Sequence, residues 1–159
     1  MTYEKAAALG AWGAGVETFL HRLDNESEAI AARTEDWSAI NSGSHELMGL
    51  ARMRAPLLEA FAVLPGEITE AKLAPSPRVR ADGAVMEVEH GAAIRVRVRP
   101  DAPIQIALTG HYDTVFPAAH AFQKPWRADA TTLRGPGVAD MKGGLSLMLA
   151  ALQAFEAMP

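Results

Sequence analysis

The sequence predicts an α/β protein in which a mixed β-sheet is sandwiched by helices. Apolar residues recur at helical spacing near both ends of the chain, over residues 4–61 and 143–158. Between these regions the period falls to two, which is typical of strands. At 159 residues the chain has the length of one domain, and its order of helices, strands and a last helix is that of a layered α/β fold.

The N-terminal region predicts helices joined by a turn. Residues 4–23 carry apolar side chains at spacings of three and four, as in one amphipathic helix, and residues 26–37 continue in the same mode. Residues 40–44, Ile-Asn-Ser-Gly-Ser, are turn formers that end this stretch. A further helix is expected over residues 45–61, and Pro56 should kink it or begin a new segment.

The middle of the chain predicts strands. Residues 68–70, 85–88 and 94–99 alternate apolar and charged side chains, as strands with one face in water do. Residues 104–109, Ile-Gln-Ile-Ala-Leu-Thr, are nearly continuously apolar, so we expect a central strand covered on both faces. The loop of residues 118–130 is long for a compact domain, which indicates a functional segment.

Composition restricts the possible partners and sites. The chain has 15 Lys and Arg against 19 Asp and Glu, a formal net charge of −4, and so lacks the basic surface of a nucleic-acid binder. Its basic cluster, Arg95, Arg97 and Arg99, has the spacing of one solvated strand face. Because the chain has no cysteine, any metal must be bound by histidine and carboxylate side chains.

The sequence also predicts a protein that works away from membranes. No apolar run approaches the roughly 20 residues that span a bilayer. The N-terminus has neither the basic region nor the hydrophobic core of a signal peptide, and the absence of cysteine agrees with a reducing compartment. We therefore expect a cytoplasmic protein without a membrane partner.

A first candidate site follows the expected central strand. Gly110-His111-Tyr112-Asp113-Thr114 stands at the C-terminal end of this strand, where ligands bind in open α/β sheets. If the strand geometry continues, His111 and Asp113 point to the same side, so that Asp113 can orient the imidazole while its other nitrogen stays free for a metal. The alternative is a histidine that caps the strand beside an aspartate that binds turn amides.

A second candidate lies in the glycine-rich turn before the last helix. Residues 134–144, Arg-Gly-Pro-Gly-Val-Ala-Asp-Met-Lys-Gly-Gly, bring the carboxylate of Asp140 to the mouth of this helix. Asp140 is either a helix N-cap or a metal ligand, and the glycines let the backbone pass close to a site. The stretch lacks the pattern G-x-x-x-x-G-K-[ST] of a phosphate-binding loop, which argues against a nucleotide.

Together these motifs resemble those of a known family. Residues 110–117 and 135–144 look like the two N-terminal signatures of the zinc-dependent exopeptidases and amidohydrolases, and the 29 positions from His111 to Asp140 suit this family. The family includes acetylornithine deacetylase, succinyl-diaminopimelate desuccinylase, aminoacylase and bacterial glutamate carboxypeptidase. The turn of residues 40–44 is similar to one in the glutamate carboxypeptidase branch, which the chain therefore resembles most closely.

The resemblance implies a zinc-exopeptidase-like catalytic domain with two zinc ions. It implies that His111 ligates one zinc ion, that Asp113 is the catalytic residue that orients His111 from behind, and that Asp140 bridges both ions. It also implies a cis peptide bond between Asp140 and Met141. Two such ions lower the pKa of a bridging water and polarise the scissile amide. Similar sites accept cobalt or manganese.

The resemblance further implies that part of the enzyme lies beyond Pro159. In relatives the general-base glutamate, three further metal ligands and the lid domain come later in the chain. We therefore expect residues 1–159 to be the N-terminal portion of the catalytic domain, an incomplete fragment that binds zinc poorly and is inactive alone. We expect Glu156 to face solvent. Exposed edges of an incomplete sheet predict a homodimer or another association through a sheet edge.

Three functions remain open from the sequence. The first is a metal-dependent hydrolase that uses a dinuclear zinc-activated water to cleave an amide bond of a small-molecule or peptide substrate. That substrate would be an N-acyl amino acid or a peptide with a C-terminal acidic residue such as glutamate. The second is a catalytically dead interaction or structural module that keeps the fold, and the third is a plain binding domain. Intact His111, Asp113 and Asp140 favour the first.

Overall fold

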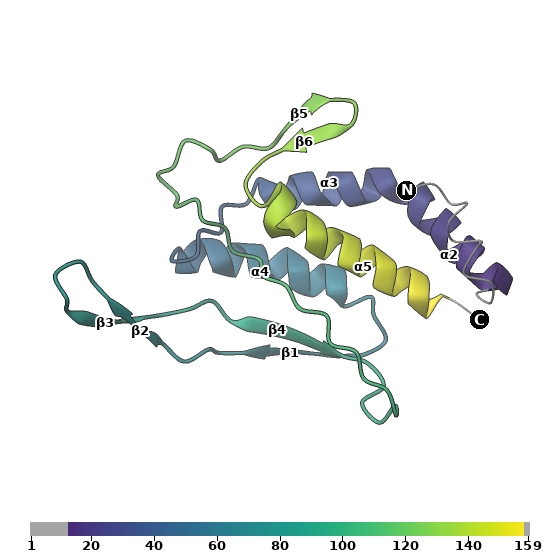
Figure 1. The fold of residues 1–159 in the computed structure, drawn as a ribbon, viewed down its shortest axis with the longest axis horizontal. Helices are drawn as coiled ribbons and strands as arrows, with labels where there is room; N and C mark the ends of the chain where they lie inside the picture. The colour runs from purple at the N-terminus through teal and green to yellow at the C-terminus, as the bar shows by residue number, and fades with distance from the viewer. Residues whose placement is uncertain (1–12, 158–159) are drawn as a thin grey trace.

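The computed structural model describes residues 13–157 and confirms the α/β class (Figure 1). Its helices and strands are α2 (Gly13–Asn25), α3 (Ser27–Ser38), α4 (Leu47–Phe61), β1 (Glu67–Ala71), β2 (Ser76–Val79), β3 (Val85–Val88), β4 (Ala93–Arg97), β5 (Trp126–Asp129), β6 (Thr132–Arg134) and α5 (Gly143–Glu156). A short π-helical turn, η1 (Val138–Lys142), leads directly into α5. None of the described helices is long and apolar enough to cross a membrane.

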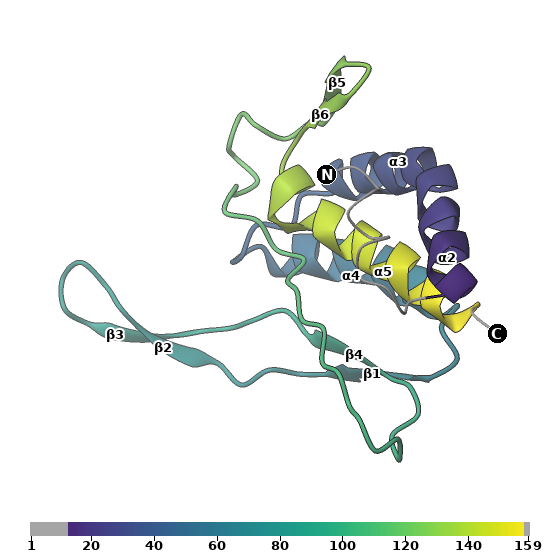
Figure 2. The same ribbon diagram turned by 45° about the vertical axis from the view of Figure 1, so that its right-hand side comes forward.

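The helices enclose the main apolar core. Helices α3 and α5 run side by side, and α4 lies next to them (Figures 1 and 2). The core consists of buried Trp37 from α3, Met53 and Leu57 from α4, and Leu145 from α5. Because such side chains recur every three or four residues, each helix presents one apolar face. Burial of a side chain of this size stabilises the fold by about 1.5–3 kcal/mol, so this contact fixes the arrangement of the helices.

The helices agree with the predictions except at one proline. Helices α2, α3 and α5 lie where helical spacing predicted them, although residues 4–12 of the first expected helix lie outside the described residues. Pro56 does not begin a new segment, because α4 runs through it to Phe61. Met53 before Pro56 and Leu57 after it are both buried in the same core, and this packing offsets the hydrogen bond that the proline cannot donate.

The strands form three separate two-stranded antiparallel sheets, so the described residues contain no single mixed sheet. Strands β1 and β4 pair from Glu67 with Arg97 to Ala71 with Ala93, and β4 contacts α4. In β4 the side chains of Arg95 and Arg97 are exposed, which confirms the expected solvated face. The β2–β3 hairpin extends away from the helices (Figures 1 and 2).

The prediction of a central strand over residues 104–109 is wrong. This segment follows the loop after β4 and passes the helices on its way to β5 without regular structure (Figures 1 and 2). Ile104, Ile106 and Leu108 are 78%, 82% and 54% exposed. A strand exists only through hydrogen bonds to a neighbouring strand, and within residues 13–157 no segment pairs with this one. The expected association through a sheet edge stays a prediction.

The second antiparallel hairpin, β5–β6, was not predicted from the sequence. It occupies the end of the long loop of residues 118–130 and the residues that follow. Arg127 of β5 pairs with Glu28 and Glu35 of α3, at N···O distances of 2.8 and 3.0 Å. These ion pairs attach the hairpin to α3, next to which it lies in Figure 1.

Candidate metal centre

The two sequence motifs meet in one cavity of about 330 Å³. Three parts of the chain surround it: the turn after α3, the segment after residue 110, and the glycine-rich turn before α5. Its lining residues are Ser44, His111, Asp113, Thr114, Val115, Phe116, Phe122, Gly135, Gly137, Ala139 and Asp140. All three site residues predicted from the sequence therefore line the same cavity.

Backbone hydrogen bonds attach the turn after α3 to the segment that carries His111. Gly43 and Thr114 form a parallel β-bridge. The Thr114 amide donates to the Ser42 carbonyl at 2.8 Å, and the Ser44 amide donates to the Thr114 carbonyl at 3.0 Å. The buried Ser42 hydroxyl donates to the Tyr112 carbonyl at 2.7 Å. The two segments consequently form one hydrogen-bonded unit, which lines the cavity through Ser44 and Thr114.

This close approach requires glycine at position 43. A Cβ atom there would lie 2.8 Å from the Phe116 carbonyl oxygen and 2.9 Å from Cγ of Glu46. The first of these neighbours is backbone, which cannot move aside without disturbing the turn. The glycine in the Ile-Asn-Ser-Gly-Ser segment is therefore explained by packing rather than by a positive φ.

The side chains after residue 110 alternate in direction, as the sequence predicted. His111 and Asp113 both face the cavity, and Nδ1 of His111 lies 3.0 Å from Oδ1 of Asp113. Tyr112 points instead towards the core, where its hydroxyl donates to the Ala92 carbonyl at 2.6 Å. This arrangement leaves Nε2 as the ring nitrogen of His111 that points away from Asp113.

Asp140 meets His111 at this second nitrogen. Oδ1 of Asp140 lies 2.8 Å from Nε2 of His111, and the Asp140 side chain is 84% exposed. Burial alone would lower the pKa of His111, but the hydrogen bond to Asp140 and the contacts with Asp113 raise it above its usual value. Both ring nitrogens therefore face carboxylate oxygens, and each carries a proton when the imidazole is charged.

The turn before α5 gives Asp140 this position. Gly137 has a φ of 77°, a left-handed conformation that favours glycine. Within η1, Asp140 has non-helical dihedral angles, and the peptide bond between Asp140 and Met141 is cis, as the resemblance implied. The residue that precedes the first turn of α5 is Lys142, so Asp140 is not the N-cap of this helix.

Residues 107–159 match the model of peptidase family M20/M25/M40. The matched region contains the segment that carries His111 and the turn that carries Asp140, but not the turn after α3. The match includes His111, Asp113 and Asp140 and suggests a metal-dependent peptidase or other hydrolase. It supports the M20 family broadly and favours no branch within it. No curated protein matches the chain.

The side chains in the cavity have suitable chemistry to ligate a divalent metal, but few of them are present. M20 peptidases generally use divalent metals such as zinc, and imidazole nitrogen and carboxylate oxygen are ordinary zinc ligands. His111 and Asp140 each offer one donor group towards the cavity, whereas Asp113 contacts the far side of the ring. Among residues 13–157 no group of three or more such side chains could hold a metal ion. A zinc ion bound here would therefore have positions left for other ligands.

Two residues that were not predicted from the sequence hold the candidate metal site in place. Lys142, two positions after Asp140, is completely buried. Its Nζ atom donates to the carbonyls of Trp37 at 3.0 Å and Ile40 at 2.7 Å, and burial lowers its pKa to about 8. This contact ties the turn that carries Asp140 to the C-terminal end of α3, where a positive charge is favoured. In the sequence, Lys142 is distinguished only by its place two positions after Asp140.

Ser44 is the other missed residue. Its Oγ atom donates to Oδ2 of Asp113 at 2.5 Å. The sequence pointed to residues 40–44 as a turn, and this turn carries the serine into the cavity. No local pattern predicted the contact, because the two residues are 69 positions apart.

Aromatic side chains form one wall of the cavity. The Phe116 and Phe122 ring centroids lie 4.9 Å apart, and Phe122 lies 5.8 Å from Trp126. Asn41 stabilises this stretch, since its amide nitrogen donates to the Phe116 carbonyl at 3.1 Å and to Gln123 at 2.6 Å. Phe122 belongs to the loop of residues 118–130 that the sequence indicated as functional, so part of this loop lines the cavity.

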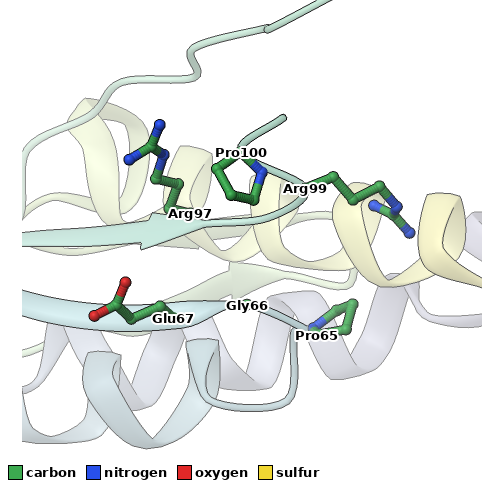
Figure 3. Close-up of a pocket in the computed structure, with 6 residues that line it drawn as sticks. All are labelled: Pro65, Gly66, Glu67, Arg97, Arg99 and Pro100. Atoms are coloured by element: carbon green, nitrogen blue, oxygen red, sulfur yellow. The ribbon is translucent and has the colours of Figure 1, made fainter. Parts of the chain in front are cut away.

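A larger hollow of about 460 Å³ lies elsewhere and offers a metal one carboxylate, Glu67, beside two arginines. It is lined by Pro65, Gly66, Glu67, Arg97, Arg99 and Pro100 (Figure 3). The Arg99 guanidinium donates to both carboxylate oxygens of Glu156, at 2.7 and 2.5 Å. The Glu156 side chain is only 16% exposed, so the expectation that it faces solvent is wrong: Arg99, two residues after β4, covers it at the last turn of α5. The smaller cavity remains the candidate site.

Proposed function

We propose that this chain is part of a metal-dependent hydrolase that cleaves an amide bond with a water activated at a dinuclear zinc centre. The substrates would be N-acyl amino acids or peptides with a C-terminal acidic residue such as glutamate. His111 would ligate one zinc ion through Nε2, and the Asp140 carboxylate would bridge both ions. Zinc ions held in this way supply a water of lowered pKa and polarise a carbonyl group.

The observation that carries the proposal is the pair of contacts on the His111 ring. Asp113 accepts a hydrogen bond from Nδ1, so the neutral ring keeps its proton on that side and presents the lone pair of Nε2 to the cavity. The Asp140 carboxylate approaches the same nitrogen. A carboxylate held behind a histidine is the usual arrangement for metal-ligating imidazoles, because it fixes the tautomer and the ring orientation.

The exposure of the carboxylates supports a bridging role for Asp140. Its side chain is 84% exposed and uses Oδ1 towards His111, so its other oxygen is available to a second ligand. An imidazole has one lone pair for a metal, whereas a carboxylate has two oxygens and can join two ions. The more enclosed Asp113 has both oxygens engaged by protein groups and acts as the orienting residue.

The aromatic wall adds a substrate-binding surface to the proposed site. Phe116 and Phe122 both line the cavity, and their ring centroids lie 4.9 Å apart. An apolar part of a substrate would pack on these rings while its amide approaches Asp140. The assignment to acidic C-terminal residues rests on the similarity of residues 40–44 to the glutamate carboxypeptidase branch.

Zinc titration of the whole chain tests the proposal. We expect zinc binding that falls at least tenfold in His111→Ala, measured by competition with a chromogenic chelator. His90→Ala is the matched control, because His90 is a half-buried histidine outside the cavity whose contact is Ser76 of the β2–β3 hairpin. Equal zinc affinity in the wild type and His111→Ala would overturn the proposal and leave a module that keeps the fold without the metal site.

A further inference from the structure

We propose that Ser44 is a positioning residue that fixes the Asp113 carboxylate and, through it, the imidazole of His111. The inference rests on the proposed metal site and extends it to the turn after α3. Neither the family match, which begins at residue 107, nor the two sequence motifs include Ser44.

The Asp113 carboxylate is held by a different donor on each oxygen. Oδ2 accepts the hydroxyl proton of Ser44 at 2.5 Å, and Oδ1 lies 3.0 Å from Nδ1 of His111. The Ser44 hydroxyl also lies 3.2 Å from the Thr114 carbonyl. A hydroxyl donates one proton, and the shorter distance to a charged acceptor assigns it to Asp113. With both oxygens engaged, the carboxylate has one preferred rotation and presents Oδ1 to the ring.

Ser44 is itself held by backbone hydrogen bonds. Its amide donates to the Thr114 carbonyl at 3.0 Å, and the preceding residue, Gly43, forms the β-bridge with Thr114. The serine is half-buried and lines the cavity. The position of its hydroxyl is therefore set by the same contacts that attach the turn to the His111 segment. This gives a continuous series of hydrogen bonds from Ser44 through Asp113 to His111.

Loss of the Ser44 hydroxyl would remove the first hydrogen bond of this series, the one to Asp113. In Ser44→Ala, Oδ2 of Asp113 loses its protein donor, and the carboxylate is free to rotate away from Nδ1 of His111. Loss of an outer hydrogen-bonding partner of a metal ligand commonly lowers metal affinity by about 10–100-fold. We therefore expect Ser44→Ala to weaken zinc binding about tenfold while the helical core, which does not include Ser44, stays folded.

The test uses the full chain in two measurements. Zinc affinity is measured by chelator competition, and the His111 ring is observed by ¹⁵N NMR in the metal-free protein at one fixed pH. We expect Ser44→Ala to weaken zinc binding about tenfold and to shift the Nδ1 resonance, and Ser44→Thr, which keeps the hydroxyl, to restore both. Ser76→Ala is the control, because it removes another serine contact, with His90, outside the cavity.

A double variant separates this role from a general loss of structure. Ser44→Ala should weaken zinc binding no further in an Asp113→Ala background, because the hydroxyl acts through Asp113. An unchanged affinity and an unchanged Nδ1 resonance in Ser44→Ala would overturn the inference. If the wild type binds no zinc but Ser44→Ala still shifts the His111 ring, the proposed function fails and the positioning contact stands.

Discussion

Nε2 of His111 lies 2.8 Å from Oδ1 of Asp140, although the two residues belong to separate segments 29 positions apart. Neither segment is part of a sheet at this point. Two independent sets of contacts bring them together: the bridge between Gly43 and Thr114 fixes the histidine side, and buried Lys142 fixes the aspartate side. The candidate metal centre is therefore assembled by turns that are bonded to the ends of the helices.

Replacement of Asp140 should remove metal affinity without unfolding the chain. Asp140→Asn keeps the shape of the side chain but removes its charge, and the side chain is 84% exposed. We expect zinc binding to weaken at least tenfold and the midpoint of thermal unfolding to stay close to that of the wild type. Asp82→Asn, which changes an exposed aspartate beside Arg80, is the matched control. Undiminished zinc binding in Asp140→Asn would exclude Asp140 as a ligand.

Buried Lys142 should make stability depend on pH. Its pKa is about 8 in the folded chain, below the ordinary value of 10.5, because burial disfavours the charged form. Between these values the unfolded chain binds more protons, so the free energy of unfolding should rise from about pH 8 to pH 10.5, by about 3 kcal/mol at most. Below pH 8 this contribution is lost.

Lys142→Met isolates this effect. The variant has no titrating group at this position, so the rise between pH 8 and 10.5 should disappear when unfolding by urea is followed over this range. Lys72→Met, at an exposed position, should keep the rise. The same pH dependence in Lys142→Met and the wild type would show that another group is responsible.

Gly43→Ala should destabilise the fold through a clash. The added Cβ would lie 2.8 Å from the Phe116 carbonyl oxygen, which is tighter than a relaxed contact allows. We expect a loss of about 1–3 kcal/mol in the free energy of unfolding, the usual range for overpacking. Gly144→Ala is the comparison, because its nearest neighbour, at 3.3 Å, is the flexible end of Met141. That variant should be neutral or up to about 1 kcal/mol more stable, since alanine favours a helix. A larger loss of unfolding free energy in Gly144→Ala than in Gly43→Ala would contradict the packing described for the turn.

The helical core should be sensitive to truncation at Leu57. This side chain is 3% exposed and packs with Trp37 and Met53. Leu57→Ala should cost about 2–5 kcal/mol of unfolding free energy, because it leaves a cavity. Leu47→Ala in the same helix, where the side chain is 45% exposed, should change stability by about 1 kcal/mol or less. Similar losses in both variants, measured by urea unfolding, would argue against this core.

The sequence predicted the helices because their signal is local. Trp37, Leu57 and Leu145 recur at helical spacing with their neighbours, and each helix can be recognised without knowledge of the others. The strand expected over residues 104–109 failed for the opposite reason. Its apolar composition is suited to a central strand, but a strand also requires a partner, and no segment within the described part of the chain pairs with it.

The same contrast between local patterns and distant contacts applies to the candidate site. The spacing of His111 and Asp113 is enough to place both on one side of an extended chain, so their contact could be predicted. Ser44 and Lys142 were missed because their partners, Asp113 and Trp37, are 69 and 105 positions away. The resemblance to known signatures linked His111 with Asp140, whereas the supporting contacts became visible only in three dimensions.

Anomalous diffraction from zinc-soaked crystals of the chain tests the central claim most directly. The account predicts a zinc peak inside the cavity, about 2.0–2.2 Å from Nε2 of His111 and from a carboxylate oxygen of Asp140. Asp113 would remain hydrogen-bonded to Nδ1 on the far side of the ring. Zinc bound only elsewhere, for example at His45 or His90, with no peak at His111, would contradict it.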